Sequence, residues 1–171
     1  MEYLVYDYME TEGKELKEIE LTKGYSTWVD DDVWEWASKL KWHANLDRDG
    51  RAYACGGGES KQRLHRLIMN APEGKCVDHI NGDTLLNIRE NLRICTNAEN
   101  CRNQKPRNGS SVYQGVVWHN QSGKWRARIM LNYKRTSLGL FDDEIEAALA
   151  YDVAARELYG AFARLNFPDE K

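Results

Sequence analysis

The segment that most constrains the fold is residues 76–103, which read CVDHINGDTLLNIRENLRICTNAENCRN. Apolar and polar residues alternate over 77–80 and again over 92–95, as they do in half-buried strands. Asn81-Gly82-Asp83 is a turn signal, and a polar loop is predicted from there to Asn91. Thr96-Asn97-Ala98-Glu99 fits the S/T-x-x-E capping box that opens a helix. The segment therefore predicts strand, loop, strand and helix in that order.

This order brings three chemically suitable side chains toward one place. Asp78 and His79 are neighbours on the first strand, so their side chains leave it in opposite directions. Asn100 lies in the first turn of the helix and can point back toward the strand of Asp78. A carboxylate and an amide oxygen are ligands suited to Mg²⁺. The imidazole, on the other face of the strand, can approach a water molecule from another direction.

The stretches VDHINGD, RENLR and AEN resemble the HNH, or ββα-metal, nuclease family, in particular its phage and intron-encoded branch. His79 matches the first motif residue, Asn91 the second and Asn100 the third, at spacings of 12 and 9 residues. Leu64-His65-Arg66-Leu67-Ile68 and the upstream LTKGY…VDDD…W are also similar to that branch. The resemblance covers roughly residues 19–103.

The resemblance implies a role for each matching residue. His79 would be the general base, and Asp78 and Asn100 would hold one divalent cation, Mg²⁺ first and Mn²⁺ second. Asn91 would hold the loop so that His79 is oriented. Three further residues are predicted to contact DNA, although His65 could equally have a packing role: His65, Arg66 and Arg93. Asn103, one helical turn beyond Asn100, is a rival ligand.

The C-terminal part predicts three strands and one helix. The strands are expected within 113–118, 124–129 and 136–141, separated by turns. The helix begins after Asp142 or Asp143 and ends at Gly160. Its apolar positions include Ala147, Ala148, Tyr151, Ala154, Ala155 and Leu158. Alternation in 124–129 places Lys124, Arg126 and Arg128 on one face and Trp125, Ala127 and Ile129 on the face that the helix covers.

The stretches YQGV, GKWRARI, LGLF, EAALAYDVAARELYG and LNFP resemble the AP2 domain, known from plant transcription factors and also found in phage nucleases. The resemblance covers nearly all of residues 112–168. It implies a DNA-facing sheet that carries Gln114, His119, Arg126, Arg128, Lys134 and Arg135. Family positions usually held by Arg are here Gln114, Val117 and Met130, and Ser137 replaces a usual Trp. The plant target sequence therefore does not transfer.

Charge is segregated along the chain, although the net charge is only −3. The segments 51–110 and 111–141 carry +4 and +5, whereas the two flanking segments carry −7 and −5. A phosphate backbone responds to this local field more than to the chain's sum. The charge pattern alone fits ordinary solvated surface equally well. No stretch approaches the roughly 18 apolar residues of a membrane span.

The sequence also predicts the compartment of the protein and the state of its cysteines. Neither a span nor a signal peptide is recognisable, so a cytoplasmic location is expected, in a bacterial or phage-infected cell. The chain has 4 cysteines, Cys55, Cys76, Cys95 and Cys101, none in C-x-x-C spacing. They are predicted to be free, mostly buried thiols, with structural zinc as the less favoured alternative.

The fold class predicted for all 171 residues is α+β. A small α+β extension is expected in 1–60, the HNH core in 61–103, a linker in 104–111 and the AP2-like domain in 112–168. Within the extension, strands are expected around the Lys23-Gly24 turn, a helix capped at Asp30–Asp32, and a hairpin across LDRDG. Its four Trp residues are expected to pack.

Three functions follow from these patterns. The first is a homing-type endonuclease that cuts or nicks double-stranded DNA and uses the AP2-like domain for affinity. The second is a binding-only regulator with a decayed nuclease unit, and the third is a four-Cys zinc module. The recognition sequence, nicking against double-strand cleavage, and the oligomeric state do not follow from the sequence.

Overall fold

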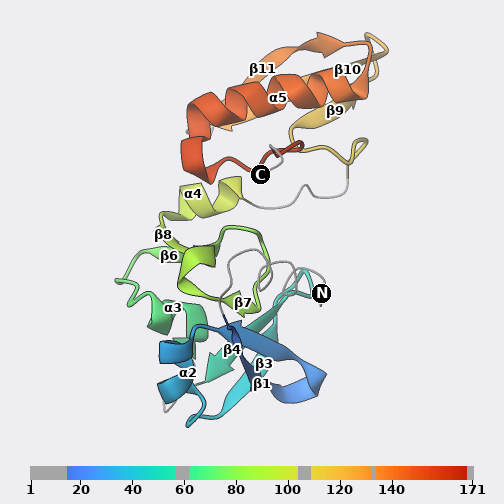
Figure 1. The fold of residues 1–171 in the computed structure, drawn as a ribbon. Coiled ribbons are helices and arrows are strands. Elements are labelled where there is room, and N and C mark those ends of the chain that lie inside the picture. Colours follow the sequence, from blue (N-terminus) through green and yellow to red (C-terminus); the bar gives the residue numbers. More distant parts are fainter. Residues whose placement is uncertain (1–14, 57–61, 104–108, 132–133, 169–171) are drawn as a thin grey trace. The chain divides into compact units, whose positions relative to one another are not determined.

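The computed structural model of the protein describes residues 15–56, 62–103, 109–131 and 134–168. The chain forms two compact units, 1–97 and 98–171 (Figure 1). Each contains sheets and helices, so the predicted α+β class is confirmed. Most of the N-terminal 18 residues and of the predicted linker lie outside the described residues, as does most of the loop at Gly56–Gly58. The four predicted domain bounds remain predictions.

Two short sheets built from hairpins form the lower part of the first unit. The first pairs β1 with β2, and the second pairs β3 with β4 and β4 with β5, all antiparallel. The predicted hairpin across LDRDG is confirmed. The strands are β1 (Lys17–Glu20), β2 (Ser26–Val29), β3 (Trp42–Leu46), β4 (Ala52–Gly56) and β5 (Gln62–Arg63). The 3-10 helix η1 (Thr22–Gly24) joins β1 to β2.

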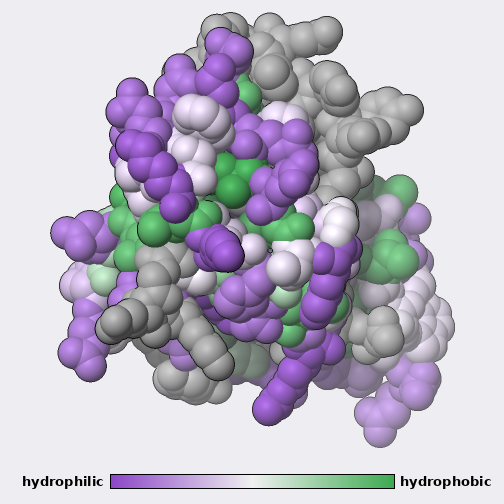
Figure 2. Space-filling model, turned by 90° about the horizontal axis from the view of Figure 1, so that it is seen from below, coloured by the Kyte–Doolittle hydropathy of each residue, from purple (hydrophilic) through white to green (hydrophobic). Residues whose placement is uncertain are grey.

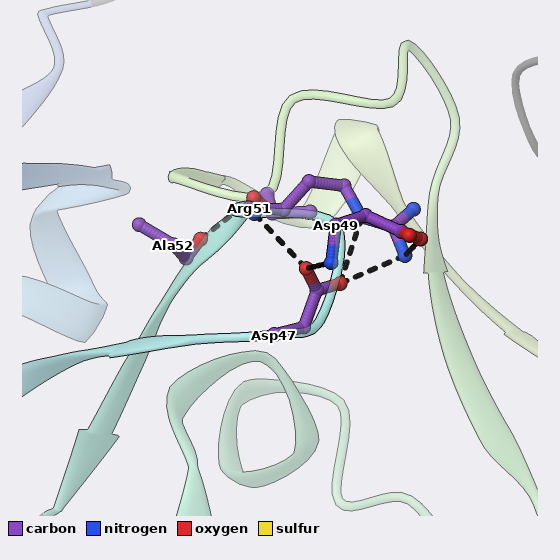
Figure 3. A network of polar contacts seen from close by, with 5 residues as sticks. Asp47, Asp49, Arg51 and Ala52 are labelled. Carbon is purple, nitrogen blue, oxygen red and sulfur yellow. Dashed lines mark hydrogen bonds and ion pairs between the residues drawn. The ribbon is translucent and has the colours of Figure 1, made fainter.

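The β3–β4 turn is closed by Asp47 (Figure 3). Its carboxylate accepts hydrogen bonds from the backbone amides of Asp49 and Arg51, at 2.9 and 3.0 Å. The guanidinium of Arg51 lies on the same carboxylate, with Nε 2.8 Å from Oδ2. An Asp that bonds the backbone two residues further on is a typical turn former. The turn thereby fixes the register of the two strands.

Helix α2 (Asp31–Ala37) begins after Asp30, as predicted, and buries Val33 and Ala37. The expected side-chain cap is wrong, because Asp30 makes no cap hydrogen bond. Its Oδ2 instead accepts the backbone amide of Arg89 at 2.9 Å. The Trp residues only partly follow the expectation: Trp42 is buried, whereas Trp34 is 40% exposed. Asp30 therefore ties the N-terminal helix to the loop of the chemical segment.

The loop predicted as polar from 81 to 91 is partly a buried strand, so that prediction is wrong. β7 (Leu86–Asn87) pairs in parallel with β2, and η2 (Arg89–Asn91) follows it. Leu85, Leu86 and Ile88 are buried. These apolar side chains draw the loop into the sheet of the N-terminal extension. The segment that carries the chemistry is thus packed on residues far away in sequence.

The strand–loop–strand–helix order of residues 76–103 is otherwise confirmed. β6 (Cys76–His79) pairs antiparallel with β8 (Leu92–Cys95), and α4 (Asn97–Arg102) follows directly. The pairing places Asp78 opposite Arg93 and His79 opposite Leu92. The short helix α3 (Leu64–Ile68) precedes β6 and buries Leu64 and His65.

The second unit contains the predicted three-stranded antiparallel sheet and helix. Its sheet has the order β11-β10-β9 and its helix is followed by a single 3-10 turn. The elements are β9 (Val116–His119), β10 (Lys124–Leu131), β11 (Lys134–Phe141), α5 (Glu144–Tyr159) and η3 (Gly160–Phe162). Asp143 caps α5 by accepting the amides of Ile145 and Glu146, and Gly160 ends it at φ +53°. Leu158 was expected to pack but is 41% exposed.

Two sets of contacts hold helix α5 against the neighbouring segments of this unit. Gly115 has φ +77°, and a Cβ there would lie 2.0 Å from Cδ2 of Tyr151, so only glycine fits. The buried carboxylate of Asp152 accepts the amides of Asn166 and Phe167, each at 2.8 Å. The segment after α5 is therefore strapped to the helix.

Most of the face shown in Figure 2 is hydrophilic, with smaller hydrophobic areas between polar side chains. Among the residues that the structure describes, no helix is both long and apolar enough to span a bilayer.

Candidate active site and DNA-binding surface

Strand β6 places Asp78 and His79 side by side in the chain, and both side chains are buried, at 7% and 4% exposure. Each faces a different set of neighbours, as adjacent residues of a strand must. Asp78 meets β8, whereas His79 meets β7 and α3. A buried carboxylate and a buried imidazole need polar partners, and each has one.

The partner of Asp78 is Arg93, which lies directly opposite it on β8. Nη2 of Arg93 is 2.6 Å and Nε is 2.9 Å from the same oxygen, Oδ2. The side chains are only 15% and 8% exposed, so little water screens the pair. Arg93 was predicted to contact DNA. In this structure it balances the charge of the residue predicted to bind metal, and its contact with DNA remains a prediction.

The partner of His79 is Asn87, a residue that the sequence analysis did not single out. His79 Nε2 lies 3.1 Å from Oδ1 of Asn87. The ring also packs edge-on against His65, with centroids 5.0 Å apart. Burial lowers the pKa of His79 below its ordinary value, against the opposing effects of the Asn87 hydrogen bond and the charge of Asp78. The imidazole is therefore neutral near pH 7, the form able to accept a proton.

His65 and Arg66 both serve the structure around the site. His65 is 4% exposed and packs between His79 and Tyr53, whose ring centroid is 5.9 Å away. Of the two roles considered for it, burial favours support of the site over DNA contact. The guanidinium of Arg66 donates to the carbonyl oxygens of Lys75, Ala71 and Pro72, and its predicted contact with DNA remains a prediction. It organises the turn that leads into β6.

Asn91 lies at the end of the loop, where a loop-holding residue is expected. Its Oδ1 accepts the amide of Asn81 at 3.0 Å, and its Nδ2 donates to the carbonyl of Leu86 at 2.9 Å. Its backbone carbonyl also accepts the amide of Ile80, at 2.8 Å. One buried side chain thus bridges both ends of the turn that follows His79.

Asn100 lies in α4 and is half-buried, whereas its rival Asn103 is buried beyond the helix end. Asp78 belongs to the first compact unit and Asn100 to the second. The sharing of an ion by these two residues therefore remains a prediction. The donor types fit it, since a carboxylate and an amide oxygen suit a hard divalent cation that keeps several waters.

The four cysteines form no disulfide: Cys55 and Cys95 are buried, Cys76 is half-buried and Cys101 is exposed. In the described ranges, no three His, Cys, Asp or Glu side chains are grouped to hold an ion. A site made of one carboxylate, one amide and waters would not form such a group.

Asn87 is in turn held by Thr27 of β2, the second residue that the sequence analysis missed. Asn87 Nδ2 donates to Thr27 Oγ1 at 2.7 Å, and Thr27 Oγ1 donates to the carbonyl of Leu85 at 2.7 Å. Both side chains have 0% exposure. Asn87 could have been noticed in the sequence, because it is a polar residue in a run of apolar ones. Thr27 lies 60 residues away from it, and nothing in the sequence indicated that the two side chains meet.

In the second unit, the alternation along β10 places its side chains as predicted. Ala127 and Ile129 are buried, and Lys124, Arg126 and Arg128 are partly exposed. A bulge between Ala127 and Arg128 shifts the pairing with β11, where Arg128 lies opposite Ser137. Lys134 and Arg135 on β11 are exposed. Arg135 lies opposite Met130 and shares the side of Arg126 and Arg128, whereas Lys134 lies opposite Leu131 on the other side. The sheet therefore carries a row of cations, Lys124, Arg126, Arg128 and Arg135, on the side away from its apolar contacts with α5.

The remaining predicted DNA contacts have local partners. Lys124 Nζ lies 3.0 Å from Oδ1 of Asp142, an exposed pair of little net strength. His119 Nδ1 lies 2.8 Å from Oγ of Ser122 in the β9–β10 turn. The amide of Gln114 donates to Oδ1 of Asn166 at 2.6 Å. Whether each of these residues meets DNA remains a prediction.

Comparison with known proteins identifies both units. Residues 63–102 match the HNH endonuclease family, which covers β6, β8 and α4. A protein of Acanthamoeba polyphaga mimivirus, named an uncharacterized HNH endonuclease, is 32% identical over 150 residues, or 84% of this chain and 76% of its own length. This chain belongs to the HNH endonuclease family. The predicted resemblance is thereby confirmed.

Residues 111–161 of this HNH endonuclease match the AP2 domain. Two Arabidopsis thaliana proteins illustrate the likeness. The AP2-like ethylene-responsive transcription factor AIL7 is 48% identical over 61 residues, 34% of this chain and 12% of its own length. The dehydration-responsive element-binding protein 2D is 49% identical over 69 residues, 37% and 32% of the two chains. Residues 111–161, which include the three-stranded sheet and α5, therefore form an AP2 domain, a DNA-binding domain.

Proposed function

We propose that this chain is an active, metal-dependent endonuclease of the homing type that nicks or cuts double-stranded DNA. The observation that carries the proposal is the buried imidazole of His79, which is held by the side chain of Asn87 and follows the carboxylate of Asp78 directly in the chain. The AP2 domain supplies affinity and register on the DNA, because tethering raises the effective concentration of the nuclease unit.

In the proposed reaction His79 removes a proton from a water molecule that attacks the phosphorus. The new bond is between phosphorus and the water oxygen, and the bond to the 3′ oxygen breaks. The leaving oxygen takes a proton from solvent. Asp78 and Asn100 would hold one divalent cation, Mg²⁺ first and Mn²⁺ second, which stabilises charge on the phosphate and the leaving oxygen. Asn91 keeps the turn after His79 closed, so that the base stays oriented.

The AP2 sheet would bind the duplex through its basic row. Arg126 and Arg128 on β10, with Arg135 on β11, present charge without any acidic residue between 111 and 141. A sheet of this size can enter the major groove. Some of these side chains would contact phosphate only and so position the protein without reading bases.

A second candidate is a binding-only regulator, and one observation favours it. Arg93 occupies Oδ2 of Asp78 at 2.6 Å, the carboxylate that the cation needs. The plant relatives with the AP2 domain are named as transcription factors. Direct measurement of Mn²⁺ binding by electron paramagnetic resonance separates the candidates. An endonuclease binds the ion in the wild type and loses it in Asp78→Asn, whereas a binding-only protein shows no difference.

Cleavage is tested with supercoiled plasmid and with DNA from the genomic neighbourhood of the gene, in Mg²⁺ or Mn²⁺. Wild type should convert the DNA to nicked or linear product, and His79→Ala should not, while both shift the DNA equally in a gel. His43→Ala, on β3, is the matched control and should cleave normally. Equal inertness of all three proteins in both metals would refute the endonuclease. Sequencing the cut ends then tests whether cleavage is site-directed.

A further inference from the structure

A continuous row of buried polar groups joins His79 to the N-terminal extension. It runs from His79 Nε2 to Asn87 Oδ1 at 3.1 Å, and from Asn87 Nδ2 to Thr27 Oγ1 at 2.7 Å. It ends with Thr27 Oγ1 donating to the backbone carbonyl of Leu85 at 2.7 Å. Thr27 lies on β2, outside the residues 63–102 that match the HNH family.

The backbone carbonyl of Leu85, at the end of this row, determines which group donates each hydrogen bond. A backbone carbonyl only accepts, so the single hydroxyl proton of Thr27 must point to Leu85. Thr27 Oγ1 must then accept from Asn87, which requires the NH₂ group of Asn87 to face Thr27. The carbonyl oxygen of Asn87 is thereby turned toward His79.

The same reasoning determines which nitrogen of His79 carries the proton. Asn87 Oδ1 can only accept, so Nε2 must be the donor. A neutral imidazole has one N–H, and the lone pair is therefore on Nδ1. The opposite amide orientation would set Oδ1 of Asn87 against a Thr27 oxygen whose proton is already used, so it is excluded on hydrogen-bond grounds.

Because these groups are buried, one tautomer of His79 is favoured over the other. Thr27 and Asn87 have 0% exposure and His79 has 4%, so water cannot replace either hydrogen bond. A buried polar group that loses its hydrogen-bond partner destabilises the folded protein by more than one hydrogen bond normally stabilises it. The tautomer with the proton on Nδ1 would set the lone pair of Nε2 against the acceptor Oδ1 of Asn87, and it is disfavoured by that cost.

We propose that Thr27 and Asn87 are positioning residues that hold His79 as the Nε2–H tautomer, so that Nδ1 is the nitrogen that takes the proton from water. The tautomer follows from the row alone, whereas its catalytic use rests on the proposed function. The N-terminal extension then contributes directly to the competence of the nuclease unit, beyond packing against it. A histidine base held in one tautomer by a second residue is a recurrent arrangement in catalysis.

The tautomer is read by long-range ¹H–¹⁵N correlation spectra of histidine-labelled full chain at slightly alkaline pH. Nε2 of His79 should have a pyrrole-type shift and Nδ1 a pyridine-type shift, with His79→Gln used for assignment. In Thr27→Val the amide of Asn87 loses its fixed orientation, so a second tautomer should appear. Thr27→Ser keeps the hydroxyl and should retain the wild-type spectrum. A pyridine-type Nε2 in the wild type would overturn the proposal.

Cleavage kinetics give the second readout. Thr27→Val should lower kcat about tenfold with KM unchanged, less than the roughly 10²–10⁴ lost with the base itself. Thr27→Ser should restore it. Thr22→Val makes the same change at an exposed threonine, whose hydroxyl accepts the amide of Ala44 at 3.1 Å, and serves as the control for the substitution itself.

The two proposals fail separately. Equal kcat in the Thr27→Val and Thr22→Val proteins would show that Thr27 acts only on stability and would overturn the positioning role. Were the wild type to cleave no DNA, the proposed function would fail, and the nitrogen shifts would still decide the tautomer. Thermal melting of each variant identifies any that fail to fold, and the wild-type spectrum does not depend on them.

Discussion

Replacing His65 by leucine should remove a large part of the protein's sensitivity to mild acid. His65 is 4% exposed and packs against the rings of His79 and Tyr53. Burial, reinforced by the charges of His79, Arg63 and Arg66, lowers the pKa of His65 to about 3 from an ordinary 6.5. The folded protein therefore holds this ring neutral, whereas the unfolded chain protonates it in the usual range.

The sign and size of the effect follow from linkage between protonation and folding. Because the folded pKa is below the unfolded one, the stability is fully present above about pH 6.5 and is lost as pH falls toward 3. Between pH 7 and 5 the unfolded state gains most of a proton that the folded state does not. The two pKa values correspond to a loss of about 2 kcal/mol over that interval, to order of magnitude.

The assay is urea unfolding followed by tryptophan fluorescence at pH 7, 6 and 5, with free energies from linear extrapolation. The wild type should lose about 2 kcal/mol more than His65→Leu between pH 7 and 5 in the transition of the first unit. All carboxylates are common to both proteins, so their contributions cancel. Parallel profiles for the two proteins would mean that His65 protonates in the folded state as easily as in the unfolded chain, and the argument from burial would be refuted.

Three further predictions concern the loop, the second unit and the DNA surface. Asn91→Ala loses the two hydrogen bonds that close 81–86, so urea unfolding should show a loss of about 2 kcal/mol and cleavage should fall with it. Asp152→Asn places an NH₂ group against the amides of 166–167, so calorimetry should show the AP2 domain destabilised by about 3 kcal/mol. Arg126→Ala should reduce the slope of log K against log salt by about 1 in DNA-binding titrations if it contacts phosphate. An unchanged slope would place Arg126 away from the backbone.

The ion pair between Asp78 and Arg93 bears on how the site would work. A buried carboxylate left without a partner is costly, and Arg93 supplies that partner at 2.6 Å from Oδ2. The pair could have been anticipated, because opposite charges at 78 and 93 fall directly across two predicted antiparallel strands. The contact of Arg93 with DNA was predicted from its charge alone, without pairing the strands, and it remains a prediction.

The local sequence pattern was sufficient to predict those elements whose stabilising partners lie close in the chain. The alternation at 77–80 and 92–95 predicted β6 and β8, and Asp143 with Gly160 predicted the ends of α5. The burial of Ala127 and Ile129 followed from the period of a strand. In each case the determining interactions are hydrogen bonds or side-chain contacts within one element or one hairpin.

Long-range packing decided the rest. The sequence by itself determined the candidate residues for the chemistry, because Asp78, His79, Asn91 and Asn100 are recognisable by type and spacing. Only the tertiary structure showed that Leu86 and Asn87 form a strand beside β2, that Asp30 binds Arg89 rather than capping α2, and that Thr27 orients Asn87. The physical reason is that these interactions join residues about 60 positions apart, so they form only when the apolar faces of two distant segments pack together. The periodicity within either segment does not specify which other segment it packs against.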